Sequence, residues 1–294
     1  MVLLIDKLVV IGVGLIGGSF ALALKRSGAV KHVVGVGRDP ENMQQALRSG
    51  AIDTIAASLA QALDGAGLVL LATPVGQMGR IMALIAPHLG AASIVTDAGS
   101  TKQDVIEAAR RNLSSSLTRF VPGHPIAGAE QSGAAAARAD LYRDKNVVLT
   151  PLPETAAESV ALVRNAWAAC GARLHLMGAE EHDEVFAAIS HLPHLLSYAL
   201  VHSIAGRSNA AQLFEFAAGG FRDFTRIAAS HPEMWRDICI ANRGALLPEL
   251  ERYGAELEEL RRILQAGDAD ALERILVAAR AARKDWSDKQ GRVE

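Results

Sequence analysis

The sequence predicts an α/β fold in two parts, an N-terminal doubly wound parallel sheet and a C-terminal all-helical domain. Two observations predict it. Short apolar, β-branched runs alternate with helical stretches up to residue 178, and after residue 178 the patterns are helical without a convincing strand. The predicted domains are therefore 1–178 and 179–294, and a chain of 294 residues is long enough for two.

Six apolar runs in the first domain have the length and residue types of buried strands. They are 8–12, 32–36, 68–72, 93–97, 146–150 and 172–177. Turn residues or a helix start follow each of the first five, and residues 154–169 form a helical pattern before the sixth. This order predicts parallel strands joined by crossover helices.

Three helical patterns fill the second domain. They span 180–205, 232–264 and 268–286. The first is largely apolar, and Pro193 is expected to kink it. Pro248 is expected to break or bend the second, and Asp268 has the residue type and position of an N-cap for the third.

Composition excludes several classes of protein. The net charge is −2 and the sequence has no basic stripe, so it lacks the positive charge pattern that nucleic-acid-binding proteins carry. The only cysteines, Cys170 and Cys239, cannot build a disulfide framework or a cysteine-rich zinc site, and they suit a reducing cytoplasm. We find neither a signal-peptide pattern nor an uninterrupted apolar run of membrane length, so no membrane association is expected.

A glycine-rich turn follows the first predicted strand. The segment Gly12-Val13-Gly14-Leu15-Ile16-Gly17 is a GxGxxG motif with a strand before it and a helix after it, at 16–26. Gly12 permits the tight turn, Gly14 lets a pyrophosphate approach the backbone, and Gly17 allows the helix to pack closely. In this context the motif predicts a Rossmann-type dinucleotide site that includes Leu15 and Ile16.

The end of the second predicted strand bears on which dinucleotide binds. NAD sites usually carry an acidic residue here that accepts the ribose hydroxyls, but this chain has Gly37 followed by Arg38. An arginine without that carboxylate favours the 2′-phosphate of NADP. NAD stays open as the alternative, with Asp39 in the acidic role.

Two further loops fall at the carboxyl ends of predicted strands, the edge at which such sheets bind ligands. One, at 72–75, contains Thr73 and Pro74, and the other, at 97–102, runs from Asp97 through Ser100 to Lys102. We expect Thr73, Pro74 and Asp97 to contact the cofactor, although an ordinary βα loop is the alternative for each.

Three longer motifs carry a family resemblance. GHPIAGAE at 123–130, SHLPH at 190–194 and GGFRDFTRIAASHPEMWRD at 219–237 together resemble the prephenate/arogenate dehydrogenase family of tyrosine biosynthesis. The resemblance extends from Gly12 to the last long helix. It implies a Rossmann domain followed by a helical dimerisation domain, and hence a homodimer.

The resemblance also implies a reaction, the oxidative decarboxylation of prephenate to 4-hydroxyphenylpyruvate or of arogenate to tyrosine. Hydride leaves the hydroxyl-bearing ring carbon for the nicotinamide, and the ring carboxylate leaves as CO₂. His124 matches the family's catalytic histidine, which accepts a hydrogen bond from the substrate hydroxyl; a free imidazole, with a pKa of about 6.5, suits that task near neutral pH. Ser100 matches a serine that contacts the same hydroxyl.

The resemblance assigns five further residues to the substrate. They are Arg226, His194, Glu130, Arg222 and Trp235. Arg226 matches an arginine that holds a carboxylate, for which a guanidinium offers a bidentate fork. Each of the others keeps a structural alternative: a gating or helix-end carboxylate for Glu130, a solvated charge for Arg222, a core histidine for His194 and a core anchor for Trp235. Some relatives carry Lys at position 222, so that role is not carried over firmly.

Two other functions remain as alternatives. One is a different dehydrogenase or imine reductase with a Rossmann domain and a helical domain, but the β-hydroxy-acid enzymes of this type use a helical-domain lysine that 180–205 lacks. The other is a dinucleotide-sensing regulator without chemistry. The spacing of His191 and His194 would allow both side chains to bind one metal ion. No third ligand accompanies them in the sequence, so no metal is expected.

Overall fold

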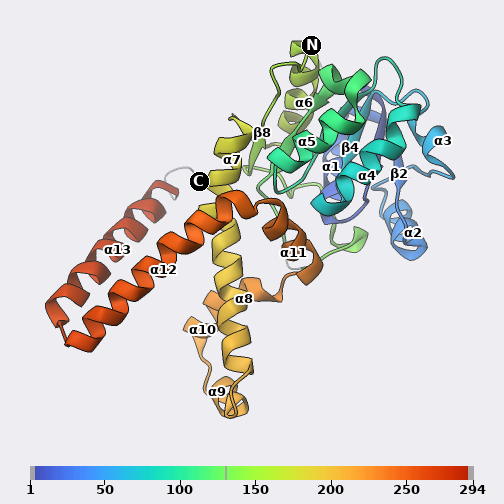
Figure 1. The fold of residues 1–294 in the computed structure, drawn as a ribbon. Helices are drawn as coiled ribbons and strands as arrows, with labels where there is room; N and C mark the ends of the chain where they lie inside the picture. The colour runs from blue at the N-terminus through green and yellow to red at the C-terminus, as the bar shows by residue number, and fades with distance from the viewer. Residues whose placement is uncertain (1–3, 130, 291–294) are drawn as a thin grey trace. The chain divides into compact units, whose positions relative to one another are not determined.

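The computed structural model describes residues 4–129 and 131–290 (Figure 1). These residues form two compact units, one ending at Leu246 and the other starting at Leu247, and each is described by itself.

A six-stranded, wholly parallel sheet forms the centre of the first unit (Figure 1). Its strands are β1 (Ile5–Ile11), β2 (Val30–Val36), β3 (Thr54–Ile55), β4 (Leu68–Leu71), β5 (Ile94–Asp97) and β6 (Phe120–Val121). Their order is β3-β2-β1-β4-β5-β6, so the chain reverses its direction of winding between β1 and β4. This arrangement confirms the predicted fold class, and it places the glycine-rich turn at the switch point where such sheets bind dinucleotides.

Helices cover both faces of this sheet, and each face has its own core. The connecting helices are α1 (Leu15–Arg26), α2 (Pro40–Arg48), α3 (Leu59–Leu63), α4 (Val75–Ile85), α5 (Gln103–Asn112) and α6 (Ala157–Ala169), with short 3₁₀ turns at Ala86–His88 and Ser114–Arg119. On one face Phe20 of α1 packs against Trp167 of α6, with ring centroids 4.4 Å apart. On the other face Met78 and Met82 of α4 pack against β4 and β5.

The last predicted strands leave the main sheet. Residues 146–150 and 172–177 do form strands, β8 (Asn146–Leu149) and β9 (Arg173–Leu176), but these pair with β7 (Gly123–Pro125) in a separate three-stranded sheet. β7 and β8 are antiparallel, and among the described residues between them the structure has a 3₁₀ turn, Ala134–Ala136, where a parallel pair would need a crossover such as a helix. The start of GHPIAGAE, whose glycines and proline are typical of a loop, is instead a strand that places His124 opposite Val148.

The first helical pattern of the second domain is continuous but irregular. It consists of α7 (Ala179–Phe186), a π-helical turn (Ala187–His191) and α8 (Leu192–Ala205). The irregularity therefore lies just before Pro193, not at it. A proline lacks the N–H for the bond to residue i−4, so the wider turn falls where that bond is missing in any case. By length and composition alone, 179–205 could also cross a membrane, and 28% of its most apolar window is buried.

The remaining helices correct one prediction and confirm another. They are α9 (Ala210–Glu215), α10 (Gly219–Thr225), a 3₁₀ turn (Arg226–Ala229), α11 (Pro232–Ala241), α12 (Arg243–Ala266) and α13 (Ala269–Gln290). The predicted break at Pro248 is wrong: Pro248 lies inside α12, and the chain breaks at Asn242, whose side chain is used to bind other segments. Asp268 caps α13 as predicted, its carboxylate accepting from the N–H of Ala271 at 2.9 Å.

Candidate active site

The glycine-rich turn fits a dinucleotide. Gly12 has a φ of +96°, and a Cβ there would lie 2.5 Å from the carbonyl oxygen of Ala72. A Cβ at Gly17 would overlap the carbonyl oxygen of Gly12, so both glycines are required by close packing. Gly14, at the N-cap of α1, has open space beside it, and the buried hydroxyl of Thr73 has no partner within the described residues. The open position is therefore the one that a pyrophosphate would approach.

The end of β2 has little room for an acidic side chain. A Cβ at Gly37 would overlap the sulfur of Met43, a buried residue of α2. Asp39 is exposed and caps α2, its Oδ1 accepting from the N–H groups of Glu41 at 3.0 Å and Asn42 at 3.3 Å. Arg38 is exposed beside it.

A chain of buried hydrogen bonds orients the His124 ring. Nδ1 of His124 lies 2.8 Å from Nε2 of His182, and Nδ1 of His182 lies 2.9 Å from Oδ1 of Asp183. The Asp183 carboxylate also accepts from the backbone N–H groups of Lys102, at 2.8 Å, and Gln103, at 2.9 Å. It therefore caps the first turn of α5 and holds His182 at the same time.

This chain of bonds assigns the ring hydrogens. A carboxylate only accepts, so Nδ1 of His182 carries a hydrogen and its Nε2, in the neutral ring, accepts. Nδ1 of His124 is then the donor, and Nε2 of His124 keeps a free lone pair. This is the tautomer that can accept a hydrogen bond from a substrate hydroxyl.

A buried ion pair holds the backbone of the same histidine strand. The Asp97 carboxylate accepts from the N–H of Gly99 at 2.8 Å and from the N–H of Gly123 at 3.1 Å. The ammonium of Lys102 pairs with Asp97 and donates to the carbonyl of Gly123 at 2.7 Å. Both polar groups of the residue before His124 are thereby fixed, by side chains that are completely buried.

Burial keeps the histidines of this region neutral. Desolvation lowers the pKa of His124 well below its ordinary value, and the nearby His182 and Lys102 lower it further. Desolvation likewise lowers the pKa of His182, although the bond to Asp183 opposes this, and it lowers the pKa of His191 to about 4. At neutral pH His124 is therefore an acceptor rather than a cation.

His194, Trp235 and Arg226 lie close together, as the motifs predict. The ring of His194, in α8, stacks on Trp235, in α11, with centroids 3.5 Å apart and an interplanar angle of 19°. The charge of Arg226 contributes to lowering the pKa of His194, after the larger effect of burial. The ring of His191 lies 6.2 Å from that of Trp235, at an interplanar angle of 72°.

Two buried N–H donors in this group have no hydrogen-bond partner among the described residues. Asn242 donates to Nδ1 of His191 at 2.9 Å, so Nε2 of that ring carries the hydrogen. Neither this N–H nor the indole N–H of Trp235 has a partner within the described residues. Since a buried donor without a partner costs free energy, the pair is suited to an anionic or hydroxylated ligand.

The other predicted site residues are less engaged. Ser100 is half-buried, in the loop that carries Asp97 and Lys102, and Leu15 and Ile16 begin α1. Arg222 is exposed on α10, four residues before Arg226. Pro74 is the N-cap of α4, and Glu130 lies outside the described residues.

Sequence reasoning missed four residues of this network. They are Lys102, His182, Asp183 and Asn242. His182 and Asp183 are adjacent, and Lys102 contacts Asp97 and Gly123, which are 5 and 21 residues away. Their other side-chain hydrogen bonds join positions 51 to 81 apart, so no local spacing predicts them. The one available signal was Lys102, a charged residue shortly after a buried strand and within the predicted site loop 97–102, to which no role was given.

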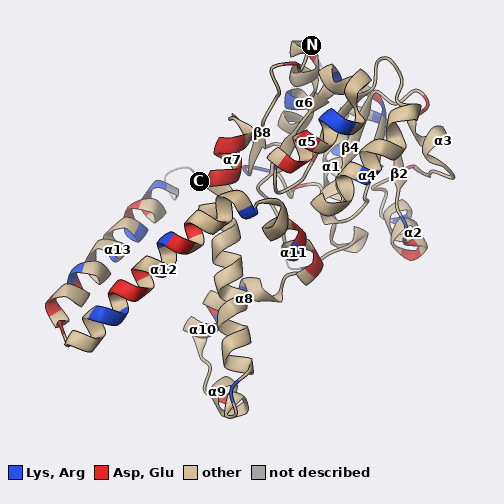
Figure 2. Ribbon diagram, viewed as in Figure 1, with Lys and Arg blue, Asp and Glu red and all other residues tan. Residues whose placement is uncertain are grey.

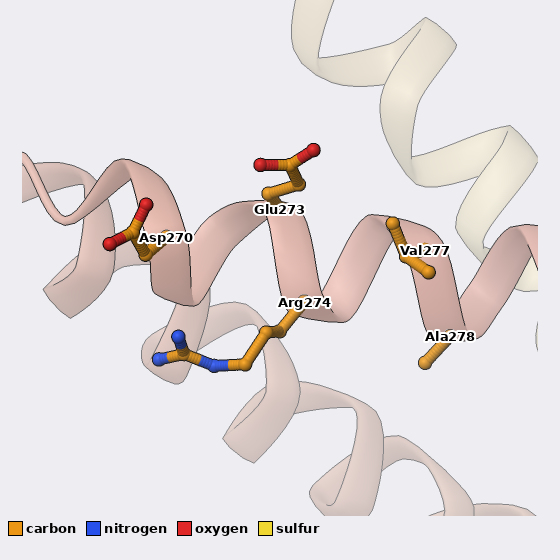
Figure 3. A pocket seen from close by; sticks show the side chains of 5 residues that line it. All are labelled: Asp270, Glu273, Arg274, Val277 and Ala278. Carbon is orange, nitrogen blue, oxygen red and sulfur yellow. The ribbon is translucent and has the colours of Figure 1, made fainter.

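A separate hollow lies on the second unit (Figure 3). Its volume is about 440 Å³, and the residues that line it all come from α13: Asp270, Glu273, Arg274, Val277 and Ala278. None of the predicted site residues belongs to it, so we assign it no role in the chemistry.

Comparison with protein families identifies the chain. The model "Prephenate dehydrogenase, nucleotide-binding domain" matches residues 20–176, and the model "Prephenate dehydrogenase, dimerization domain" matches residues 178–278. The chain belongs to the prephenate dehydrogenase family. The resemblance inferred from the three motifs is thereby confirmed.

Individual relatives agree with this membership. The chain is 38% identical to prephenate dehydrogenase of Bacillus subtilis over 96% of this chain and 76% of the relative. It is also 38% identical to cyclohexadienyl dehydrogenase of Zymomonas mobilis, over 90% of each chain. The structure resembles prephenate dehydrogenase from Aquifex aeolicus, in complex with hydroxyphenyl propionate and NAD⁺, with a TM-score of 0.90 and 35% identity over 95% of this chain and 98% of the other. Arogenate dehydrogenase from Synechocystis follows with 0.79 and 31%, over 95% and 99%. The chain is an NAD(P)-dependent oxidoreductase of this family.

The buried histidines predict that acid destabilises the fold. The unfolded chain takes up protons on histidine below a pH of about 6.5, whereas folded His124, His182 and His191 stay neutral to lower pH. The free energy of unfolding should therefore fall as the pH drops from about 6.5. His191 alone should account for a loss of up to about 3 kcal/mol, complete below its folded pKa of about 4.

Urea unfolding between pH 7.5 and 4 measures this slope. His191→Gln should flatten it, while the same change at exposed His88 should leave it as in the wild type. A free energy of unfolding that stays constant over this range would contradict the assignment of neutral buried histidines.

Proposed function

We propose that this chain catalyses the oxidative decarboxylation of prephenate, of arogenate or of both, giving 4-hydroxyphenylpyruvate and tyrosine respectively. The observation that carries the proposal is the bond chain Asp183–His182–His124, which leaves Nε2 of a neutral buried imidazole free to accept. We further propose that residues 1–178 bind the dinucleotide and that residues 179–294 supply the substrate-binding and dimerisation surfaces.

His124 acts on the substrate hydroxyl. Nε2 accepts the hydrogen bond from that hydroxyl, so the proton has an acceptor as the carbon–oxygen bond becomes a carbonyl. The bound nicotinamide supplies the acceptor for the hydride that leaves the same carbon. Loss of the ring carboxylate as CO₂ then returns an electron pair to the ring, which becomes aromatic. The carbonyl oxygen, now a phenolate, takes the proton back from His124 and becomes the phenol of the product. The neutral state of His124 is essential, because a protonated imidazole has no lone pair to offer.

The group around Trp235 is proposed to hold the substrate's anionic end. Arg226 presents a guanidinium to a carboxylate, and His194 lies within the influence of its charge. The unpartnered N–H groups of Trp235 and His191 add donors. Ser100 is proposed to share the substrate hydroxyl with His124, whereas Glu130 and Arg222 are proposed to contact the side chain.

The proposal predicts turnover and its dependence on His124. The purified chain should oxidise prephenate or arogenate with NAD⁺ or NADP⁺, measured as formation of the reduced dinucleotide. His124→Asn should lower kcat by about 10²–10⁴-fold with little change in KM, because an amide accepts a hydrogen bond but is not a base. Since the pKa of His124 is low, the wild-type kcat should decline only well below pH 6.5, and this decline should vanish in the variant.

Two control variants separate chemistry from folding. His182→Asn, which removes the bond that orients His124 together with the imidazole bond to Asp183, should cost about tenfold in kcat and keep the acid limb. His202→Asn, at an exposed position of α8, should behave as the wild type. A chain that oxidises neither substrate would point to another dehydrogenase or to a regulator, and a fully active His124→Asn would assign the proton to a different group.

NADP is proposed as the preferred cofactor. Met43 fills the space that a side chain at Gly37 would need, so the usual acidic residue of NAD sites is missing. The Asp39 carboxylate is occupied with the cap of α2, and exposed Arg38 is available to a 2′-phosphate. NAD remains the second candidate, since the Aquifex neighbour was solved with NAD⁺.

This proposal predicts a higher kcat/KM with NADP⁺ than with NAD⁺. Gly37→Asp should shift the ratio toward NAD⁺ but lower the Tm, because Met43 must move. The double variant Gly37→Asp/Met43→Ala should keep the shift without that clash, although Met43→Ala alone loses core packing and is measured as the control. Wild-type kinetics that favour NAD⁺ would contradict the interpretation of this site.

The chain is proposed to act as a homodimer in the cytoplasm. Its second family match is to a dimerization domain, and residues 192–205 contain no charged side chain (Figure 2). Large apolar side chains are exposed in this helix and in the segments before and after it, including Leu200 at 36%, Ile189 at 67% and Phe216 at 76%. A second copy that covers this surface accounts for an exposed apolar helix, and such an interface should exceed the usual area of about 1,600 Å².

Light scattering should therefore give about 62 kDa at micromolar concentration, twice the 31.0 kDa of one chain. Leu200→Glu, in α8, should weaken the dimer because it would bury a charge at the interface. Leu84→Glu, a similarly exposed leucine of α4, is the matched control and should leave the mass unchanged. A monomeric wild type would exclude the dimer.

A further inference from the structure

One side chain of α2 joins two segments that are far apart in the sequence. The amide nitrogen of Asn42 donates to the carbonyl of Val13, in the glycine-rich turn, at 2.7 Å. Its amide oxygen accepts from the N–H of Ala134, also at 2.7 Å. Because a carbonyl only accepts and an N–H only donates, these partners fix the orientation of the amide.

Ala134 belongs to a segment that lies along the dinucleotide domain. Residues 133–142 form part of the connection that runs from β7, the strand of His124, to β8. The N–H of Arg138 donates to the buried hydroxyl of Ser19 at 2.9 Å, and the hydroxyl of Tyr142 donates to the carbonyl of Ile16 at 2.6 Å. A Cβ at Gly18 would lie 2.8 Å from the Cβ of Ala137, so the second glycine of the Gly17–Gly18 pair permits this close approach.

Ser19, Ile16 and Gly18 all belong to α1, and their contacts hold the segment to one helix. Asn42 differs from them because it reaches the turn itself, between the two glycines that frame the position open to a pyrophosphate. A side chain that only held segment 133–142 in place would not need a hydrogen bond to the Val13 carbonyl. The direction of that carbonyl fixes the peptide plane shared with Gly14, whose N–H donates to the carbonyl of Gly12 at 3.0 Å and so closes the turn.

We propose that Asn42 is a positioning residue that couples the dinucleotide turn to segment 133–142. The proposal rests on the dinucleotide site of the proposed function but not on the identity of the substrate. Ordering of the turn by a bound dinucleotide is passed through the two amide bonds to segment 133–142. The same bonds hold the turn in its binding conformation when the site is empty.

Amide hydrogen exchange tests the coupling directly. In the wild type, saturating NADP⁺ should slow exchange in peptides from the turn and in peptides covering 133–142. In Asn42→Ala the turn should still be protected at saturation, but protection of 133–142 should be lost. The Kd for NADPH, measured by fluorescence, should rise about tenfold, as expected for the loss of one buried hydrogen bond at the site.

Two further variants make the outcome specific. Asn42→Asp keeps the acceptor for Ala134 and loses the donor to Val13, so it should uncouple 133–142 as Asn42→Ala does while disturbing the fold less. Gln44→Ala, at an exposed position of the same helix, should match the wild type in Kd and in exchange.

The proposal would be overturned if NADP⁺ protected segment 133–142 equally in the wild type and in either Asn42 variant. It would also be overturned if NADP⁺ did not slow exchange in this segment in the wild type. Failure of the proposed substrates to turn over leaves this test unaffected, because it measures only dinucleotide binding and exchange.

Discussion

The buried carboxylate of Asp183 is the contact on which the rest of this site depends. It accepts from His182 and from two N–H groups at the start of α5, while its backbone carbonyl accepts from Asn242. These bonds hold the pKa of the carboxyl below its ordinary value, although burial alone would raise it. Removing a carboxylate from water is costly unless it is fully hydrogen-bonded, and here each bond also orients another part of the site.

His124 is consequently fixed from two directions by one short segment. The loop after β5 holds the backbone of Gly123 through Asp97 and Lys102, and the first N–H groups of α5 hold Asp183, which orients the ring through His182. The ammonium of Lys102 lies near enough to lower the pKa of both histidines. The segment thus sets the position of the imidazole and helps to set its charge state, the two properties that a general base requires.

The two halves of the chain use polar and apolar residues differently. In the α/β half, buried polar groups concentrate at the carboxyl ends of strands and in the helix facing them, and the sheet itself is apolar. In the helical half, α8 is uncharged, whereas α12 and α13 carry interspersed charges of both signs (Figure 2). An exposed apolar helix is typical of a surface that a partner covers, in keeping with the match to a dimerization domain of this family.

The sequence alone determined the parallel sheet, the glycine-rich turn and the identity of the family. These features depend on local patterns: apolar runs that alternate with helices, GxGxxG between a strand and a helix, and motifs such as GHPIAGAE. The position of the Asp268 cap could be predicted for the same reason, since a cap acts within one helical turn.

Only the tertiary structure decided that β8 and β9 leave the main sheet, because pairing depends on which strands the connections bring together. It also decided that the helix breaks at Asn242 rather than at Pro248, and that His182 and Asp183 orient a histidine 58 residues before the first of them. Contacts between residues so far apart in the sequence produce no periodic sequence pattern. They depend on how the folded chain brings distant segments together, and not on the sequence neighbours of each residue.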